Sequence, residues 1–139
     1  MQRRSGSFVR STPLLELGDT FINLNPGSPE HLWVVTTPPD HEGSVVIFNV
    51  TTRRPGCDTT CVVVAGEHPF VKHESVIQYN RGQVFTATAL DALRRLACFQ
   101  AHAAATRHLV YKIQRGALDS ERTPQKLQEI VSRNLITLP

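Results

Sequence analysis

The chain has 139 residues, of which 40% are hydrophobic and 19% are charged, and its formal net charge is +3. A chain of this length is expected to form one compact domain, and its apolar share is sufficient for a modest core, which argues against disorder. It contains no run of 18 apolar residues, so the sequence predicts no membrane-spanning helix. The basic residues near its start precede no apolar segment, which argues against a signal peptide. Its three cysteines are too few for a disulfide framework, and a cytoplasmic location is expected.

Residues 14–85 show short apolar runs separated by turn residues, a pattern that predicts strands. Residues 1–13 are polar and basic and are expected to form a flexible arm. Five runs then follow one another with no helical pattern between them. They cover residues 16–24, 32–37, 44–52, 60–64 and 75–79. The run at 44–52 is almost continuously apolar, which is typical of a strand covered on both faces. The pattern predicts a small antiparallel β-barrel or sandwich. The lone tryptophan, Trp33, is expected to pack in its core, with stacking on a nucleic-acid base as the less favoured alternative.

Beyond residue 85 the spacing of apolar residues changes to that of amphipathic helices. Three stripes include Leu90 and Leu93, Leu109 and Ile113, and Leu127 and Val131. Thr123 and Pro124 predict the start of the third helix, as an N-cap and a proline in the first turn. Residues 86–139 are therefore expected to be a helical extension of the same domain, with two or three helices covering one side of the barrel. The expected fold class is α+β.

Positive charge is concentrated in the C-terminal part of the chain. Residues 84–139 hold eight Lys or Arg and four Asp or Glu, whereas residues 1–83 hold seven and eight. This imbalance is weak support for an anionic partner such as nucleic acid, because solvated helices often carry similar charge.

Six histidines are candidates for acid–base chemistry, because an imidazole gains or loses a proton near neutral pH. His31, His68 and His73 are expected in loops or at strand ends. Two imidazoles beside one phosphate can divide the work of metal-free RNA cleavage. One removes the proton of the ribose 2′-OH, and the other protonates the departing 5′-oxygen. A solvated surface position is the alternative for each of them.

The segment 57–73 allows a different interpretation. Cys57, Cys61, His68 and His73 are the ligand types of a closed zinc site. Their spacing departs from that of common zinc fingers, and Cys61 is equally suited to burial at the start of a strand. A non-catalytic binding module, stabilised by a structural zinc ion, is therefore an alternative to an enzyme.

The end of the run at 44–52 carries hydroxyl groups followed by guanidinium groups. Thr51 and Thr52 precede Arg53 and Arg54, and Lys72 lies in a later loop. Hydroxyl, guanidinium and ammonium groups donate hydrogen bonds to phosphate oxygens. These residues are therefore candidates for binding a phosphodiester, with a solvated basic turn as the alternative.

Four short motifs in residues 16–80 resemble, in order and spacing, the MazF/PemK family of toxin endoribonucleases. They are Leu17-Gly18-Asp19-Thr20, the Pro/Gly/Ser-rich loop 25–31 with the strand after it, Thr51-Thr52 at a strand end, and Ser75-Val76-Ile77. The resemblance implies a small SH3-like β-barrel followed by helices packed on it. It also implies the toxin of a type II toxin–antitoxin system, which cuts single-stranded RNA by 2′-OH attack without a metal or other cofactor. Its protein partners would be a cognate antitoxin and a second copy of the chain, with which it would form a homodimer.

The resemblance also assigns roles to individual residues. The catalytic threonine of the family falls on Thr51, whereas the position of its catalytic arginine holds His31. Either His31 takes over part of the arginine's role, or Arg53 or Arg54 reaches the same space, or the fold persists without cleavage. The expected catalytic residues are His31, Thr51, Thr52, His68 and His73, and the expected RNA-binding residues are Arg53, Arg54 and Lys72.

Overall fold

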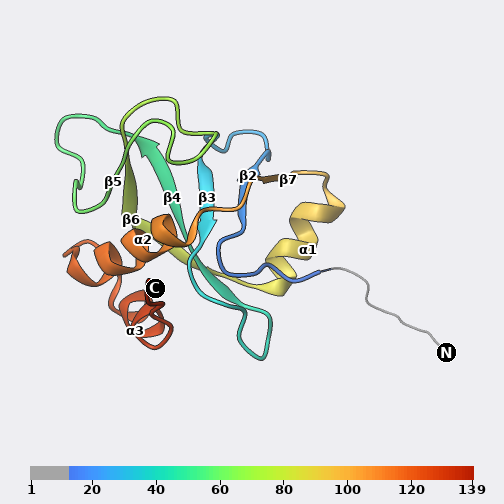
Figure 1. Cartoon of the computed structure of the whole chain (residues 1–139). Helices are drawn as coiled ribbons and strands as arrows, with labels where there is room; N and C mark the ends of the chain where they lie inside the picture. Colours follow the sequence, from blue (N-terminus) through green and yellow to red (C-terminus); the bar gives the residue numbers. More distant parts are fainter. Residues whose placement is uncertain (1–12) are drawn as a thin grey trace.

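The computed structural model describes residues 13–139, which form a curled antiparallel sheet of six strands and three helices (Figure 1). The arm expected over residues 1–13 lies, apart from Pro13, outside the described residues. The elements in chain order are β2 (Thr20–Asn23), β3 (Leu32–Val35), β4 (Val45–Thr52), β5 (Val62–Val63), β6 (Ser75–Phe85), α1 (Ala87–Arg95), β7 (Phe99–His102), α2 (Arg107–Asp119) and α3 (Gln125–Ser132). No helix in the described part combines the length and apolar character that a membrane span requires.

The sheet has the strand order β5-β6-β4-β3-β2-β7, and all neighbouring strands are antiparallel. The central strand β4 is the almost continuously apolar run, and its first six residues are all buried, as predicted. Its partner β6 is longer than expected. The register between the two strands shifts between Ile47 and Asn49, and such an irregularity bends a strand. The same long strand thereby pairs with both halves of β4, and the sheet curls.

Strand β7 was not expected, because the sequence beyond residue 85 shows only helical stripes. It pairs with β2 from Thr20↔His102 to Asn23↔Phe99 and forms one edge of the sheet. Its sequence, Phe-Gln-Ala-His, has neither an apolar run nor β-branched residues, and none of its four side chains is fully buried. Pairing with β2 and stacking of Phe99 on Phe21, with ring centroids 5.1 Å apart, stabilise it instead. Residues 86–139 thus add a strand to the sheet as well as three helices.

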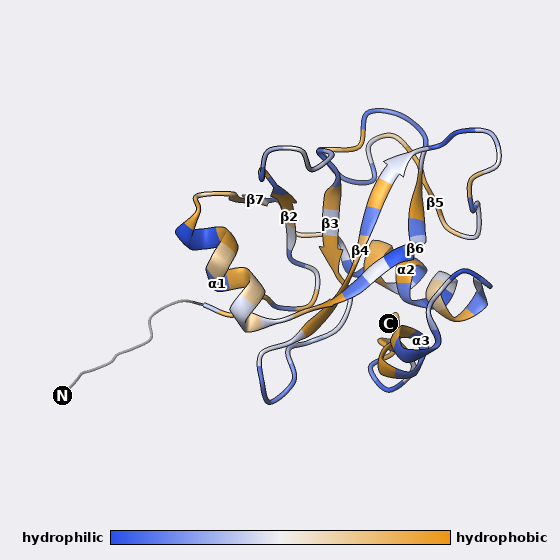
Figure 2. Cartoon of the chain, turned by 180° about the vertical axis from the view of Figure 1, so that it is seen from behind, coloured by the Kyte–Doolittle hydropathy of each residue, from blue (hydrophilic) through white to orange (hydrophobic). Residues whose placement is uncertain are grey.

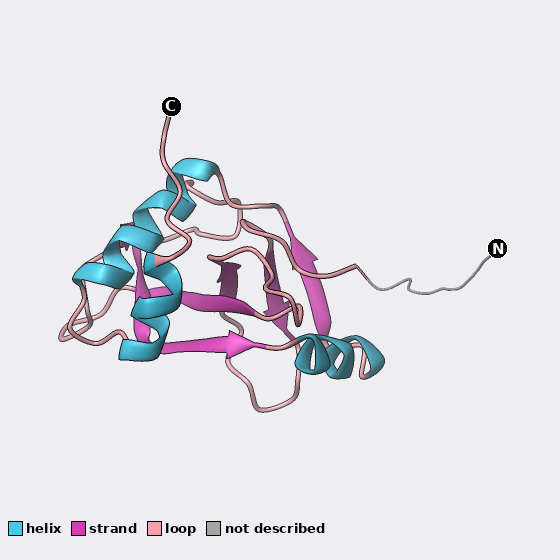
Figure 3. Cartoon of the chain, turned by 90° about the horizontal axis from the view of Figure 1, so that it is seen from below, coloured by secondary structure: helices cyan, strands magenta, loops and turns pink. Residues whose placement is uncertain are grey.

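The helices pack on both faces of the sheet, which corrects the expectation that they cover one side. Leu90 and Leu93 of α1 join one apolar cluster, which includes Phe21 and Ile47. α2 and α3, which lie beside each other and apart from α1 (Figure 3), join a second cluster that includes Phe48. Alternate residues of β4 point to opposite faces, so a strand whose first four residues are all apolar needs cover on both.

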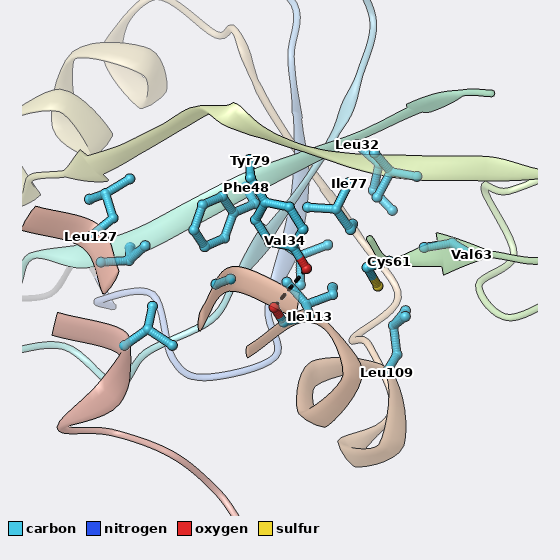
Figure 4. Packing of buried hydrophobic residues seen from close by; sticks show 14 of the residues in the cluster. Leu32, Val34, Phe48, Cys61, Val63, Ile77, Tyr79, Leu109, Ile113 and Leu127 are labelled. Carbon is cyan, nitrogen blue, oxygen red and sulfur yellow. Dashed lines mark hydrogen bonds between the residues drawn. The ribbon is translucent and has the colours of Figure 1, made fainter. Parts of the chain in front are cut away.

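The second cluster is closely packed around Tyr79 (Figure 4). The Tyr79 hydroxyl donates a hydrogen bond of 2.9 Å to the carbonyl oxygen of Ile113 in α2, and its ring meets Phe48 edge-on. This approach requires glycine at position 116, where a Cβ atom would overlap the Tyr79 hydroxyl. Position 116 of α2 therefore has to be glycine as long as position 79 of β6 is tyrosine.

Two of the three helices begin with a threonine whose side chain accepts a backbone hydrogen bond. Thr86 caps α1, and Thr106 caps α2. The third helix departs from the prediction, because Pro124 occupies the N-cap position and the hydroxyl of Thr123 makes no hydrogen bond. Thr123 therefore does not cap α3.

Candidate functional site

Two adjoining cavities lie beside β4 and share one lining residue, His31. The strand cavity, of about 310 Å³, is lined mainly by strand residues: Asn23, Ser28, Pro29, His31, Trp33, Asn49, Gln78, Arg81 and Gln83. The loop cavity, of about 350 Å³, lies at the end of β4 and is lined by Glu30, His31, Val50, Thr51, Thr52, Arg54, Phe70, Val71, Lys72, His73 and Ser75. Figure 1 shows the loops that precede β3, β5 and β6 at the same end of the sheet, where β4 ends.

The loop cavity brings together six of the residues that the sequence analysis selected. They come from three segments and are His31, Thr51, Thr52, Arg54, Lys72 and His73. Pairing of Thr51 with Val76 and of Thr52 with Ser75 places the end of β4 beside the segment that precedes β6. The antiparallel sheet is thus the reason why residues distant in the chain meet at one cavity.

His31 stands between the two cavities and is partly buried. Its backbone N–H donates a hydrogen bond of 2.9 Å to the carbonyl oxygen of Pro29, which holds the turn before β3. Burial, and then the positive charge of Arg81, lower the pKa of His31 below its ordinary value. This shift favours the neutral ring, the form that accepts a proton.

The cations of the loop cavity are available to an anion. Arg54 and Lys72 are exposed, and within residues 13–139 neither side chain forms an ion pair. Glu30 is the one acidic side chain in the lining. The cavity therefore offers positive charge to a ligand that carries a phosphate.

Arg53 departs from the predicted set. Its Nη1 atom lies 3.3 Å from Oε1 of Glu74, and it borders a separate hollow formed by residues 53–59. Successive residues at a strand end point in different directions, and only Arg54 reaches the loop cavity. The prediction that Arg53 binds the same phosphate is therefore not supported.

His68 is a structural residue rather than the exposed acid or base that its loop position predicts. Its side chain is 1% exposed and does not line the loop cavity. Its Nδ1 accepts a hydrogen bond of 3.0 Å from the backbone N–H of Phe70, which places the proton on Nε2. Nε2 then donates to the carbonyl oxygen of Ala103 at 2.6 Å. His68 thereby ties the loop that carries Phe70 and Val71 to the segment after β7.

The four residues considered for zinc do not form a metal site. Within residues 13–139, no three Cys, His, Asp or Glu side chains are arranged to hold an ion. Cys61 is buried in the apolar cluster around Tyr79, and burial raises the pKa of its thiol, which opposes the thiolate form that zinc binds. His68 is held by backbone groups instead. The zinc-stabilised module therefore lacks the ligand geometry it requires.

The sequence analysis missed the strand cavity. Trp33 packs against the apolar cluster under α1, as expected for a core residue, but it is partly exposed and also lines the cavity. In the sheet Trp33 pairs with Asn49, and Asn49 pairs with Gln78. A signal was present, because Asn49 interrupts the apolar run of β4. Figure 2 shows the polar stretches in the middle of β4 and β6.

Comparisons of this chain with protein-family models, with curated protein sequences and with solved structures found no match. The two cavities and the residues that line them are therefore the features of this chain that bear on its function.

Proposed function

We propose that this protein is a metal-independent endoribonuclease of the MazF/PemK toxin type, which cuts single-stranded RNA in the loop cavity. The observation that carries the proposal is the gathering of two imidazoles, two hydroxyls and two cations around one cavity of about 350 Å³. Imidazoles can carry out the two proton transfers of RNA cleavage, and cations and hydroxyls can stabilise the phosphate during the reaction. The curled antiparallel sheet is compatible with the SH3-like barrel of that family.

In the proposed reaction, His31 acts as the general base. Its neutral imidazole removes the proton of a ribose 2′-OH, and the 2′-oxygen attacks the adjacent phosphorus. The bond from phosphorus to the 5′-oxygen of the next nucleotide breaks, and His73 donates a proton to that oxygen. The products are a 2′,3′-cyclic phosphate and a 5′-hydroxyl end. The lowered pKa of His31 supports its assignment to the base.

The remaining polar groups of the loop cavity bind the phosphate. Arg54 and Lys72 offset the negative charge that develops on its oxygens, and the hydroxyls of Thr51 and Thr52 donate hydrogen bonds to them. Because His31 occupies the position of the family's catalytic arginine, Arg54 supplies the guanidinium group of the site. The proposal thus adopts two of the alternatives that the sequence allows, with His31 as the base and Arg54 as the guanidinium.

The proposal includes a cognate antitoxin that blocks the loop cavity and a homodimer of the toxin. Exposed Arg54, Lys72 and His73 favour an acidic segment of such an antitoxin over a basic one. Expression of the chain alone is then expected to arrest growth, and co-expression of the antitoxin to relieve the arrest.

The direct test incubates the purified, folded protein with single-stranded RNA in EDTA. We expect cleavage, and we expect His31→Ala to lower its rate by roughly a hundred- to ten-thousand-fold, the usual contribution of a general base. His41→Ala is the matched control, because His41 is exposed and lines neither cavity. RNA that is bound but left intact by the folded wild-type protein would contradict the proposal and favour a non-catalytic binding module.

A further inference from the structure

One residue that lines the strand cavity, Asn49, carries a buried amide oxygen that has no hydrogen-bond partner. Asn49 is 1% exposed and lines this cavity. Its Nδ2 donates to Oε1 of Gln78 at 2.6 Å, whereas its Oδ1 is unpaired. Buried side-chain oxygens are normally hydrogen-bonded, so an unpaired one on a residue that lines a cavity points to a missing ligand donor.

The walls of the strand cavity add an aromatic surface and further amide groups. Trp33 provides the aromatic surface, and Gln78 and Gln83 of β6 and Asn23 of β2 contribute side-chain amides. The Oε1 atom of Gln78 is occupied by Asn49, so its Nε2 group remains as a donor. Donors, an acceptor and an indole thus surround one cavity.

We propose that the strand cavity is a nucleobase-binding subsite, where Trp33 contacts the face of the base and the Asn49–Gln78 pair hydrogen-bonds its edge. A nucleobase is a planar group with donors and acceptors side by side on its edge, which matches the amide groups of the cavity. Stacking on an aromatic side chain is the common way in which proteins hold an unpaired base.

This inference rests on the proposed function, because it names the part of the RNA that adjoins the reacting phosphate. His31 lines both cavities, so a base in the strand cavity and a phosphate in the loop cavity belong to neighbouring positions of one strand. The base then fixes the ribose near His31. Asn49 and Trp33 are accordingly specificity-determining residues, and they take no part in proton transfer.

The test uses Trp33 as a reporter, because it is the only tryptophan in the chain. Short single-stranded DNA oligonucleotides serve as probes, since they lack the 2′-OH and are not cut by the proposed reaction. We expect them to change Trp33 fluorescence and to shift its single indole N–H resonance. An abasic oligonucleotide of the same length and charge is expected to bind without changing either signal.

Two variants separate the cavity from general effects on the strands. Asn49→Leu is expected to weaken binding of the base-containing probe by roughly tenfold, the loss that corresponds to about one hydrogen bond. Asn80→Leu, which changes an exposed amide of β6 outside both cavities, is expected to bind as wild type does. If Asn49→Leu does not fold, Gln78→Leu removes the accessible partner of the same pair.

The outcomes distinguish this inference from the endoribonuclease proposal. Equal Trp33 signals from abasic and base-containing probes, or unchanged binding by folded Asn49→Leu or Gln78→Leu, would overturn the base subsite even if RNA is cut. A signal that depends on the base and on Asn49, together with no RNA cleavage, would support the subsite and contradict the enzyme.

Discussion

Two buried side-chain amides lie in different regions of the molecule and differ in whether all their polar atoms have hydrogen-bond partners. Gln114, on α2, satisfies both ends of its amide. Its Nε2 donates to the carbonyl oxygens of Thr36 and Asn134, and its Oε1 accepts from the N–H of Ile136. Asn49, on β4, pairs only its Nδ2 and leaves its Oδ1 without a partner. The contrast separates a region in which polar groups hold the fold together from one in which they remain available to a ligand.

The difference between the two amides follows from what lies next to each of them. The chain after α3 returns across α2 and provides two of the partners of Gln114, so that region is closed. On the other face of the sheet, α1 covers the apolar half formed by Phe21, Ile47 and Phe85, and the polar part around Asn49 borders the strand cavity. Substitutions in the closed region are therefore expected to change stability, and substitutions beside the cavities to change function.

The largest expected effect falls on activity. His73→Ala removes the proposed proton donor and is expected to lower the cleavage rate by roughly a hundred- to ten-thousand-fold. Because His73 is exposed, the midpoint of urea unfolding is expected to stay close to that of wild type. His108→Ala, which changes an exposed histidine on α2, serves as the control. Wild-type cleavage by His73→Ala would remove His73 from the mechanism.

The largest expected effect on stability concerns Gln114. Gln114→Met keeps the size of the side chain but leaves one buried and two half-buried backbone groups without these partners, and a buried group left unpaired costs about 1–3 kcal/mol. Asn49→Leu removes one hydrogen bond and an unpaired oxygen, so we expect a cost of about 1 kcal/mol or less. Urea unfolding of both variants measures the difference. Equal losses would show that the two amides play the same structural role.

Gly116 tests how closely the same region is packed. Alanine normally stabilises a helix interior relative to glycine by about 1 kcal/mol. Here its Cβ atom would overlap the Tyr79 hydroxyl, and overpacking of this kind costs about 1–3 kcal/mol. We therefore expect Gly116→Ala to lower the free energy of unfolding, measured by urea titration. A more stable variant would mean that Tyr79 moves without cost.

The smallest expected effect is a shift in pH dependence. Burial and Arg81 lower the pKa of His31, and cleavage requires the neutral ring, so activity is expected to fall as the pH drops through that lowered value. Arg81→Gln removes the positive charge and raises the pKa of His31. The acidic limb of the profile of kcat/KM against pH is then expected to move to higher pH. A limb that stays in place would argue against His31 as the base.

Local patterns were sufficient to predict much of the fold. The apolar run of β4 and the helical stripes of α1, α2 and α3 depend on neighbouring residues, and all four elements are present. β7 and the second half of β6 depend on their partners. Asn80, Arg81 and Gly82 are poor strand residues by composition, yet they lie in the strand that pairs with the first half of β4. Such pairing is not visible in the sequence of one segment.

The site was predictable in its residue types and less so in its geometry. Thr51, His31 and His73 stand at strand ends or in loops, where functional side chains commonly occur, and they line one cavity. His68 stands in a similar loop, but its ring turns inward to bond Ala103, and Arg53 turns toward Glu74. The direction of a side chain in a loop depends on tertiary contacts, which the spacing of residues does not reveal.

The structure of the cleavage products tests the central claim most directly. An RNA oligonucleotide and a copy with one 2′-deoxynucleotide on the 5′ side of the cut are incubated with the protein in EDTA, and the ends are identified by mass spectrometry. The account predicts a 2′,3′-cyclic phosphate or 3′-phosphate and a 5′-hydroxyl from the RNA, and no cut at the substituted position. Products with a 5′-phosphate and a 3′-hydroxyl, or equal cleavage of both oligonucleotides, would contradict it.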